Sequence, residues 1–327
     1  MRLRTWLIIL TVMTVVAGGV AAWTLTGHSP QAAAGPDAAI GARTRAPSSA
    51  RPSPSRPEPR PTIAVTGAPD GVKAKGAVLA DAATGQVLWG RDTNTMRPMA
   101  SVTKVMTALL VLQSGDLGRE IRIPKAAVSS AWMYGGETAA LHPGDVLTAA
   151  ELLPALLLAL GADAAYTLAN AYGPGLTAFV ARMNATAARM GMTHTHFTSP
   201  DGLPYPTETS TYSTPADLLT LGLAAMRYPA FRSVVDLQFY HLPKGSGHHQ
   251  YWWDNTDDLI GSYSGAVGIK DGYTDDAGHC LLFEAVRGSR TLIGVVLDSP
   301  ASGQAAGAHD AEQMLNWGFR LGDSATG

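Results

Sequence analysis

Strand-forming segments lie at both ends of the globular part of the chain, and a helical stretch separates them. Near the amino end, residues 76–92 indicate strand, turn and strand, with Gly85 in the turn. Three further strands are expected at 264–272, 279–287 and 290–298. We expect these strands to pair into one antiparallel sheet with helices on its faces, which gives an α/β fold of the α+β kind.

Helical signals fill the middle of the chain. A helix is expected to begin at Ser101, and further helices are expected at 148–171, 176–190 and 214–226. Each of these three is opened by a capping-type threonine or by a Gly-Pro break. A final helix is expected at about 308–321.

The amino-terminal part of the chain has a different composition from the rest. Residues 5–25 carry no charge, and as a helix they would be about 31 Å long, close to the roughly 30 Å core of a bilayer. We interpret residues 1–27 as a signal peptide or a membrane anchor, with the following chain outside the cytoplasm. Residues 28–70, rich in Pro, Ala, Arg and Ser, are predicted to be a stiff linker, and residues 71–322 the folded domain.

Charge and cysteine content exclude several classes of function. Residues 1–60 hold seven arginines and two acidic residues, whereas the remainder is acidic overall, which argues against nucleic acid as a partner. Cys280 is the single cysteine, so neither an intrachain disulfide nor a cysteine-based zinc site is expected. The pairs His194/His196 and His248/His249 have no accompanying H-E-x-x-H frame, and we predict no metal site.

Ser101 and Lys104 have the spacing that places two side chains on one face of a helix. A serine in the first helical turn benefits from free backbone N–H groups and from the helix dipole if it must become an alkoxide. A lysine with an ordinary pKa of about 10.4 is a poor base, so burial and a second cation would have to lower its pKa. On spacing alone, Ser101 could equally be a simple helix cap.

The wider sequence resembles one known family. Residues 76–112 resemble the opening of the D-alanyl-D-alanine carboxypeptidases, the low-molecular-weight penicillin-binding proteins of the S11 serine peptidase type. Four later segments resemble the same family in the same order: 152–169, 179–204, 212–231 and 263–300. The resemblance implies a sheet flanked by helices plus a helical lobe, as in DD-peptidases and β-lactamases. A class A β-lactamase is less favoured, because its Ser-Asp-Asn motif and deacylating glutamate are not in place.

The resemblance implies roles for residues of the first two family motifs. Ser101 corresponds to the acylated nucleophile and Lys104 to its general base. The second motif, usually Ser-x-Asn, is replaced by Leu160 and Ala162, which have neither a hydroxyl for a proton relay nor an amide to hold substrate. The neighbouring Asp163 is expected to cap or pair within the helical lobe.

The third motif, usually Lys-Thr-Gly, is Lys270-Asp271-Gly272 here. By resemblance, Lys270 supplies the second cation, Gly272 leaves the strand bare for a peptide, and backbone N–H groups of Ser101 and Tyr273 bind the oxyanion. Asp271 would repel a terminal carboxylate: at about 4 Å and an effective dielectric of 20, two like charges cost about 4 kcal/mol, on the order of a thousandfold in binding. Asp271 is either neutralised by Lys270 or turned away, or the site no longer prefers a free terminal D-alanine.

Two functions are consistent with these residues. The first is an exported or membrane-tethered carboxypeptidase without metal or cofactor that trims the terminal D-alanine of peptidoglycan stem peptides through Ser101. The second is a catalytically weakened relative that binds wall peptide or a β-lactam. The intact first motif, with Lys270 and Gly272, favours the first function, and the altered positions Leu160, Ala162 and Asp271 favour the second.

Overall fold

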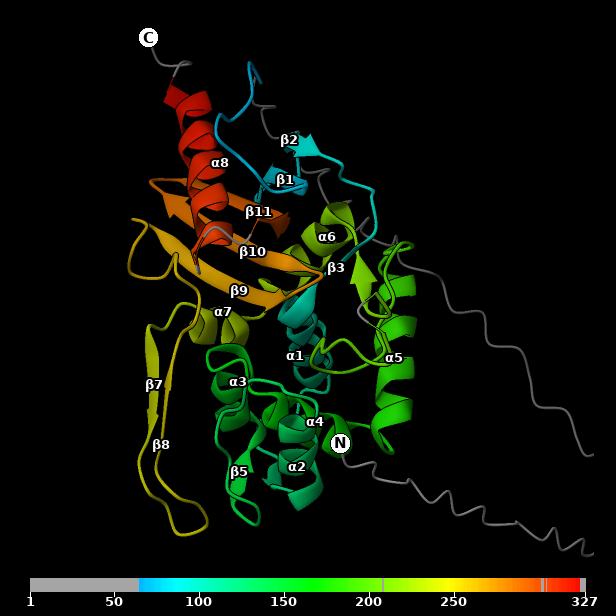
Figure 1. Cartoon of the computed structure of the whole chain (residues 1–327). Coiled ribbons are helices and arrows are strands. Elements are labelled where there is room, and N and C mark those ends of the chain that lie inside the picture. Colours follow the sequence, from blue (N-terminus) through cyan, green and yellow to red (C-terminus); the bar gives the residue numbers. More distant parts are fainter. Residues whose placement is uncertain (1–64, 208, 301–302, 304, 324–327) are drawn as a thin grey trace, which may run out of the picture. The chain divides into compact units, whose positions relative to one another are not determined.

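One five-stranded antiparallel sheet organises the domain (Figure 1). The computed structural model describes residues 65–207, 209–300, 303 and 305–323. The strands, in spatial order, are β2 (Val87–Arg91), β1 (Gly76–Asp81), β11 (Arg290–Ser299), β10 (Gly278–Arg287) and β9 (Ala266–Thr274). The amino-terminal hairpin therefore pairs with the carboxyl-terminal strands, and the expected sheet is confirmed.

Both faces of this sheet are covered, which explains why its central strands are apolar throughout. In β1, Val78 and Ala80 belong to one core, whereas Ala77 and Leu79 belong to a second. This separation follows from the alternation of side chains along a strand. Helix α6 (Pro215–Ala225) contributes to the first core, and helix α8 (Ala306–Asp323) to the second.

A lobe of helices lies beside the sheet on the side of β9 (Figure 1). Helix α1 (Lys104–Gln113) runs through its centre, and nine of its ten residues are buried. The helices around it are α2 (Lys125–Met133), α3 (Ala149–Leu157), α4 (Ala162–Tyr172), α5 (Leu176–Arg189) and α7 (Pro229–Val235). The expected combination of a flanked sheet with a helical lobe is thus observed.

Three short two-stranded sheets complete the described fold. They are β3 (Arg97–Pro98) with β6 (Tyr212–Ser213), β4 (Glu120–Arg122) with β5 (Val146–Thr148), and β7 (Phe239–Leu242) with β8 (Tyr251–Asp254). The β7–β8 hairpin was not predicted. Its two tryptophans differ: Trp253 is buried and donates to the Ala139 carbonyl at 2.8 Å, whereas Trp252 is exposed and stacks on Phe239.

Two helix predictions need correction. The helix expected at 148–171 is two helices, α3 and α4, because the chain turns sharply between them: Leu160 has a φ of +55°, and a side chain at Gly161 would collide with the Ala155 carbonyl. The predicted start of α3 is right, since Thr148 and Glu151 form a capping box. The helix expected to begin at Ser101 begins with a 3₁₀ turn, η1 (Ala100–Thr103), before α1.

The predicted export or anchor segment, 1–27, and nearly all of the predicted linker, 28–70, lie outside the described residues. Within the described part of the chain, none of the helices combines the length and apolar composition needed to span a bilayer.

Candidate active site

Ser101 lies in the 3₁₀ turn η1, where the chain enters helix α1. The preceding residue, Ala100, has a φ of +46°, a left-handed conformation that is unfavourable for an L-residue. The Val102 N–H closes the turn by donating to the Met99 carbonyl at 3.2 Å. Ser101 remains half-buried among fully buried neighbours, so its hydroxyl is held in one place at the head of the helix.

Lys104 contacts Ser101 directly. Its Nζ donates to Ser101 Oγ at 2.9 Å and to the Asp201 carbonyl oxygen, also at 2.9 Å. The side chain is only 1% exposed, so the stem packs in the core and the ammonium has few other partners. The spacing of three residues along the chain is therefore realised as a contact between the two reactive groups, which a simple helix cap would not require.

The pKa of Lys104 is shifted toward neutrality. Burial lowers its pKa from 10.5 to about 8, and the positive charge of Lys270 contributes to the decrease, whereas the carboxylates of Asp201, Asp271 and Asp163 oppose it. With a pKa of about 8, about a tenth of the Lys104 amine is unprotonated at pH 7. An amine in that state, hydrogen-bonded to a serine hydroxyl, can act as a general base.

A loop that the sequence motifs did not single out supports this pair. Thr107 Oγ1 donates to the Pro200 carbonyl at 2.6 Å, one turn beyond Lys104 on α1. Gly202 has a φ of +85°, and a Cβ there would overlap the Ala100 carbonyl oxygen. The Pro-Asp-Gly run of this loop could have signalled a tight turn, but nothing in it reveals that the Asp201 carbonyl accepts from a lysine far along the chain.

Strand β9 passes close to the other side of Ser101. A Cβ added to Gly272 would lie 2.6 Å from the Ser101 backbone nitrogen, closer than real Cβ atoms come. The predicted need for glycine at 272 therefore has a second cause, because the strand backbone itself packs on the turn that holds Ser101. Tyr273, the next residue, is 48% exposed and lines the cavity described below.

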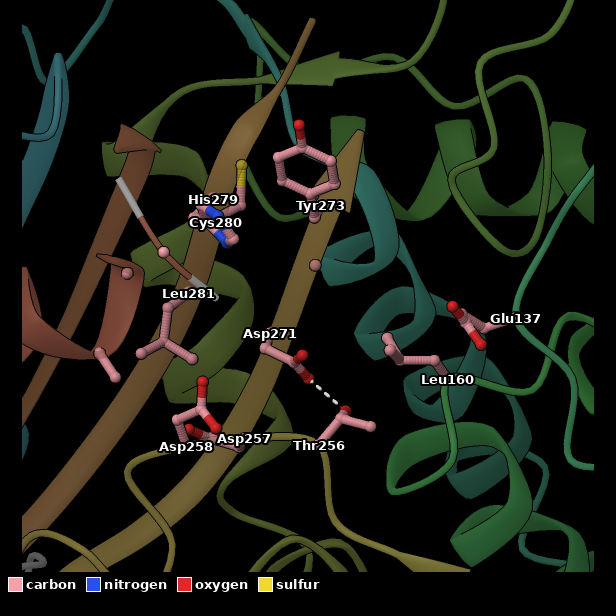
Figure 2. A pocket seen from close by; sticks show the side chains of 14 residues that line it. Glu137, Leu160, Thr256, Asp257, Asp258, Asp271, Tyr273, His279, Cys280 and Leu281 are labelled. Carbon is pink, nitrogen blue, oxygen red and sulfur yellow. Dashed lines mark hydrogen bonds between the residues drawn. The ribbon is translucent and has the colours of Figure 1, made fainter. Parts of the chain in front are cut away.

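Lys270 and Asp271 form an ion pair at the centre of β9. Lys270 Nζ lies 2.5 Å from Asp271 Oδ1, and the same oxygen accepts from Thr256 Oγ1 at 2.8 Å (Figure 2). Lys270 is fully buried, whereas Asp271 is about one quarter exposed. Of the alternatives raised by the sequence, the structure places Asp271 against Lys270, so much of the cationic charge of Lys270 is neutralised within the motif.

Of the two second-motif positions, Leu160 and Ala162, only Leu160 has a side chain that faces β9 across the cavity. Leu160 lines the cavity opposite Asp271 (Figure 2). Ala162 is fully buried, does not line the cavity, and uses its N–H to donate to the Glu137 carbonyl at 2.8 Å. Asp163 is also fully buried and accepts from three backbone N–H groups, those of Ala139, Leu141 and Ala164, as expected for a capping residue.

A cavity of about 620 Å³ extends from the edge of β9 toward the start of α8. Gly272 lines the cavity. Ser101 does not, but it lies immediately behind Gly272. Acidic residues that the sequence motifs missed contribute to this lining: Glu137, Asp257 and Asp258. They come from the loop between α2 and β5 and from the loop between β8 and β9, and no spacing rule connects them with the motifs.

Asp257 is the most unusual of these residues. It is 3% exposed, and its pKa is raised to about 7, first by burial and then by the nearby Asp271 carboxylate. Asp257 Oδ1 accepts from the Leu259 N–H at 3.0 Å, but Oδ2 has no hydrogen-bond partner among the described residues.

The histidine pairs serve structural contacts. The His194 N–H donates to Asp217, and His249 Nδ1 lies 2.9 Å from Asp145 Oδ1. Among the residues that the structure describes, no group of three or more His, Cys, Asp or Glu side chains is arranged to hold a metal ion.

The flanked sheet with its helical lobe and the buried lysine on the Ser101 hydroxyl fit the class of serine peptidases that the sequence resemblance implied. The family model of the S11 peptidases, the D-alanyl-D-alanine carboxypeptidases, matches residues 63–301. The chain belongs to this family, and the resemblance seen in its sequence is confirmed.

Individual relatives agree with this assignment. The chain is 36% identical over 262 residues to a D-alanyl-D-alanine carboxypeptidase of Streptomyces sp. strain K15, covering 76% of this chain and 88% of that protein. It is 37% identical over 259 residues to the D-alanyl-D-alanine carboxypeptidase DacB2 of Mycobacterium tuberculosis, covering 79% and 86%. The crystal structure of the Streptomyces K15 DD-transpeptidase superposes with a TM-score of 0.72 at 35% identity, covering 78% of this chain and all of that one.

Proposed function

We propose that this chain is a serine-type D-Ala-D-Ala carboxypeptidase that removes the terminal D-alanine of peptidoglycan stem peptides. The observation that carries the proposal is the buried side chain of Lys104. Its Nζ lies 2.9 Å from Ser101 Oγ, and its pKa is lowered to about 8. A merely structural serine at a helix start does not need a buried lysine on its hydroxyl. Membership of the D-alanyl-D-alanine carboxypeptidase family supplies the substrate class.

Acylation follows from the geometry around Ser101. Lys104 Nζ accepts the hydroxyl proton while Ser101 Oγ attacks the carbonyl carbon of the penultimate D-alanine. The backbone N–H groups of Ser101 and Tyr273 are assigned to the oxyanion. The carbon–nitrogen bond then breaks, and the leaving D-alanine nitrogen takes the proton back from Lys104. A water activated by Lys104 hydrolyses the ester, so no metal or cofactor is required.

The third-motif residues tune this base and hold the peptide. Lys270 lowers the pKa of Lys104, and Asp271 raises it, so the two side chains oppose each other at the catalytic lysine. Gly272 lets a peptide lie along β9 without a side chain in its path. On the opposite wall, Leu160 contributes an apolar contact to substrate and no proton relay.

Peptidoglycan and β-lactams are the partners that this assignment implies, and the enzyme would act outside the cytoplasm. Residues 1–27 would export or anchor it, and the basic, proline-rich residues 28–70 would hold the domain away from the membrane. Membrane fractionation of cells expressing the full chain tests this part, because deletion of residues 1–27 should leave the protein in the cytoplasm.

Intact-mass spectrometry after incubation with penicillin tests the nucleophile. We expect a one-to-one adduct on the wild-type protein and none on Ser101→Ala. Release of D-alanine from diacetyl-L-Lys-D-Ala-D-Ala should follow the same pattern. A wild-type protein that forms no adduct at high penicillin concentration and long times would contradict the proposal.

The Lys270–Asp271 ion pair favours a second candidate, a weakened homologue that binds wall peptide or β-lactam without efficient turnover. The pair reduces the positive charge available to Lys104 and to a substrate carboxylate. An adduct that forms on Ser101 and persists, together with undetectable release of D-alanine, would favour this candidate.

A further inference from the structure

The end of the cavity beside β9 is strongly acidic. Four carboxylate side chains line it: Glu137, Asp257, Asp258 and Asp271. Figure 2 shows Asp257 and Asp258 beside Asp271, with Glu137 on the opposite wall near Leu160. A peptide in this groove would place its group beyond the scissile bond in a field of negative charge.

No cation among the described lining residues balances this charge. The lining contains neither lysine nor arginine, and His279 is its one basic side chain. Gly303, Gly307 and Ala308, which line the cavity near the start of α8, add no charge to it. Lys270 is nearby, but its Nζ is already 2.5 Å from Asp271 Oδ1. A terminal carboxylate would therefore enter this region without an unpaired cation to receive it.

The buried carboxyl of Asp257 is an acceptor without a donor. Asp257 lines the cavity and is 97% buried, yet its Oδ2 has no hydrogen-bond partner among the described residues. Asp271 adds a second acceptor close by. Its Oδ1 is occupied by Lys270 and Thr256, whereas its Oδ2 has no hydrogen bond to any other residue that the structure describes. Buried acceptors of this kind are satisfied by a ligand that brings N–H donors.

We infer that the subsite formed by Asp257, Asp258 and Asp271 binds a positively charged, amine-bearing group on the leaving side of the substrate. Peptides whose portion beyond the scissile bond carries an ammonium group are then cleaved faster than the stem peptide that ends in a free carboxylate, which remains a substrate. This inference rests on the proposed function, since it concerns the same groove and the same acyl-enzyme on Ser101.

Three peptides of matched size test the inference on the full-length protein at pH 8, where Asp257 is mostly ionised. Each is diacetyl-L-Lys-D-Ala-D-Ala extended at its carboxyl end by a 2-aminoethyl, a 2-hydroxyethyl or a carboxymethyl amide. Cleavage of the D-Ala-D-Ala bond yields the same product, diacetyl-L-Lys-D-Ala, from all three. We expect kcat/KM to fall in the order ammonium, hydroxyl, carboxylate, with about tenfold or more between the first and the last.

Isosteric variants locate the effect. Asp257→Asn and Asp271→Asn remove one negative charge each and should reduce the ratio of ammonium to carboxylate substrate severalfold. Asp271→Asn also frees Lys270, so it should shift preference furthest toward the carboxylate. Asp276→Asn removes the same charge from the exposed β9–β10 turn outside the cavity lining and should leave the ratio unchanged.

The outcomes separate failure of the inference from failure of the proposed function. Equal rates for the three peptides, or preference for the carboxylate, would overturn the inference while the Ser101 adduct with penicillin still forms. A protein that cleaves none of the peptides and forms no adduct would overturn the proposed function itself. Thermal unfolding of each variant ensures that a changed ratio is read only from folded protein.

Discussion

The two sides of the candidate site differ in the polarity of their side chains: the turn that leads into α1 is one side, and the segment around Leu160 is the other. On the α1 wall, Ser101 and Lys104 keep a hydrogen-bonded pair in a buried, well-packed turn. On the facing wall, Leu160 presents a hydrocarbon side chain, and Ala162 does not reach the cavity. The comparison shows that the predicted nucleophile and its predicted base keep the family residues and contact each other. The positions predicted to hold substrate and relay a proton carry apolar side chains or a carboxylate.

The largest effect is expected at the intact wall. Lys104→Met keeps the buried volume of the side chain but removes the base, so acylation by penicillin should slow by on the order of 10³. The second-order rate constant of adduct formation measures this. If the variant retained more than a tenth of the wild-type rate, Lys104 would not be the base, and the contrast between the walls would disappear.

On the side of Leu160, substitution of Asp163 should lower the stability of the fold more than it changes the acylation rate. Asp163→Ala removes the acceptor of the Ala139 and Leu141 N–H groups in a fully buried position. These two donors and the Ala164 N–H, which loses the same acceptor, are left unsatisfied and should lower the free energy of unfolding by about 3 kcal/mol. Urea denaturation followed by circular dichroism measures the change, with the exposed Asp276→Ala as a control that should stay within about 0.5 kcal/mol of wild type.

Gly272 tests how closely the substrate strand must approach the nucleophile. Gly272→Ala places a methyl group 2.6 Å from the Ser101 nitrogen and should displace β9 or the turn, with a loss of about 10² in acylation rate. Gly118→Ala is the matched control, because a Cβ there meets nothing within 4 Å and the residue has no positive φ. Similar rates for both variants would show that the contact with β9 is dispensable.

The smallest expected effect is a shift in the pH profile. Lys104 must lose its proton to act as a base, so acylation should rise about tenfold per pH unit below pH 8 and level off above about 8. Asp271 raises the pKa of Lys104, so Asp271→Asn should move the midpoint to lower pH. Stopped-flow acylation between pH 5 and pH 10 measures both, and a midpoint that moves upward would contradict the assigned electrostatics.

Much of the architecture could be predicted because it depends on local patterns. The apolar segments around β1, β10 and β11 indicated strands buried on both faces, and threonine caps placed the starts of α3 and α6 at Thr148 and Thr214. The break between α3 and α4 could not be foreseen. It depends on a left-handed Leu160, a conformation that leucine itself disfavours and that the surrounding packing imposes.

The candidate site divides in the same way. Family motifs located Ser101, Lys104, Lys270 and Gly272, but they gave no indication of Asp201, Thr256 or Asp257. Those residues lie in loops whose spacing carries no periodic signal, and they reach the site only after the sheet and the helical lobe have packed. The roles of the motif residues stay predictions until the variants are measured.

The sequence by itself determined that a serine and a lysine share one helical turn, that strands lie at both ends of the domain with helices between them, and that Gly272 leaves β9 bare. These features depend on neighbours along the chain or on a repeating period. Only the tertiary structure decided that Lys104 is buried enough for its pKa to fall to about 8, that Lys270 pairs with Asp271, and that four carboxylates share one cavity. Desolvation and charge pairing depend on distances through space, and those distances are set by packing between segments far apart in the chain.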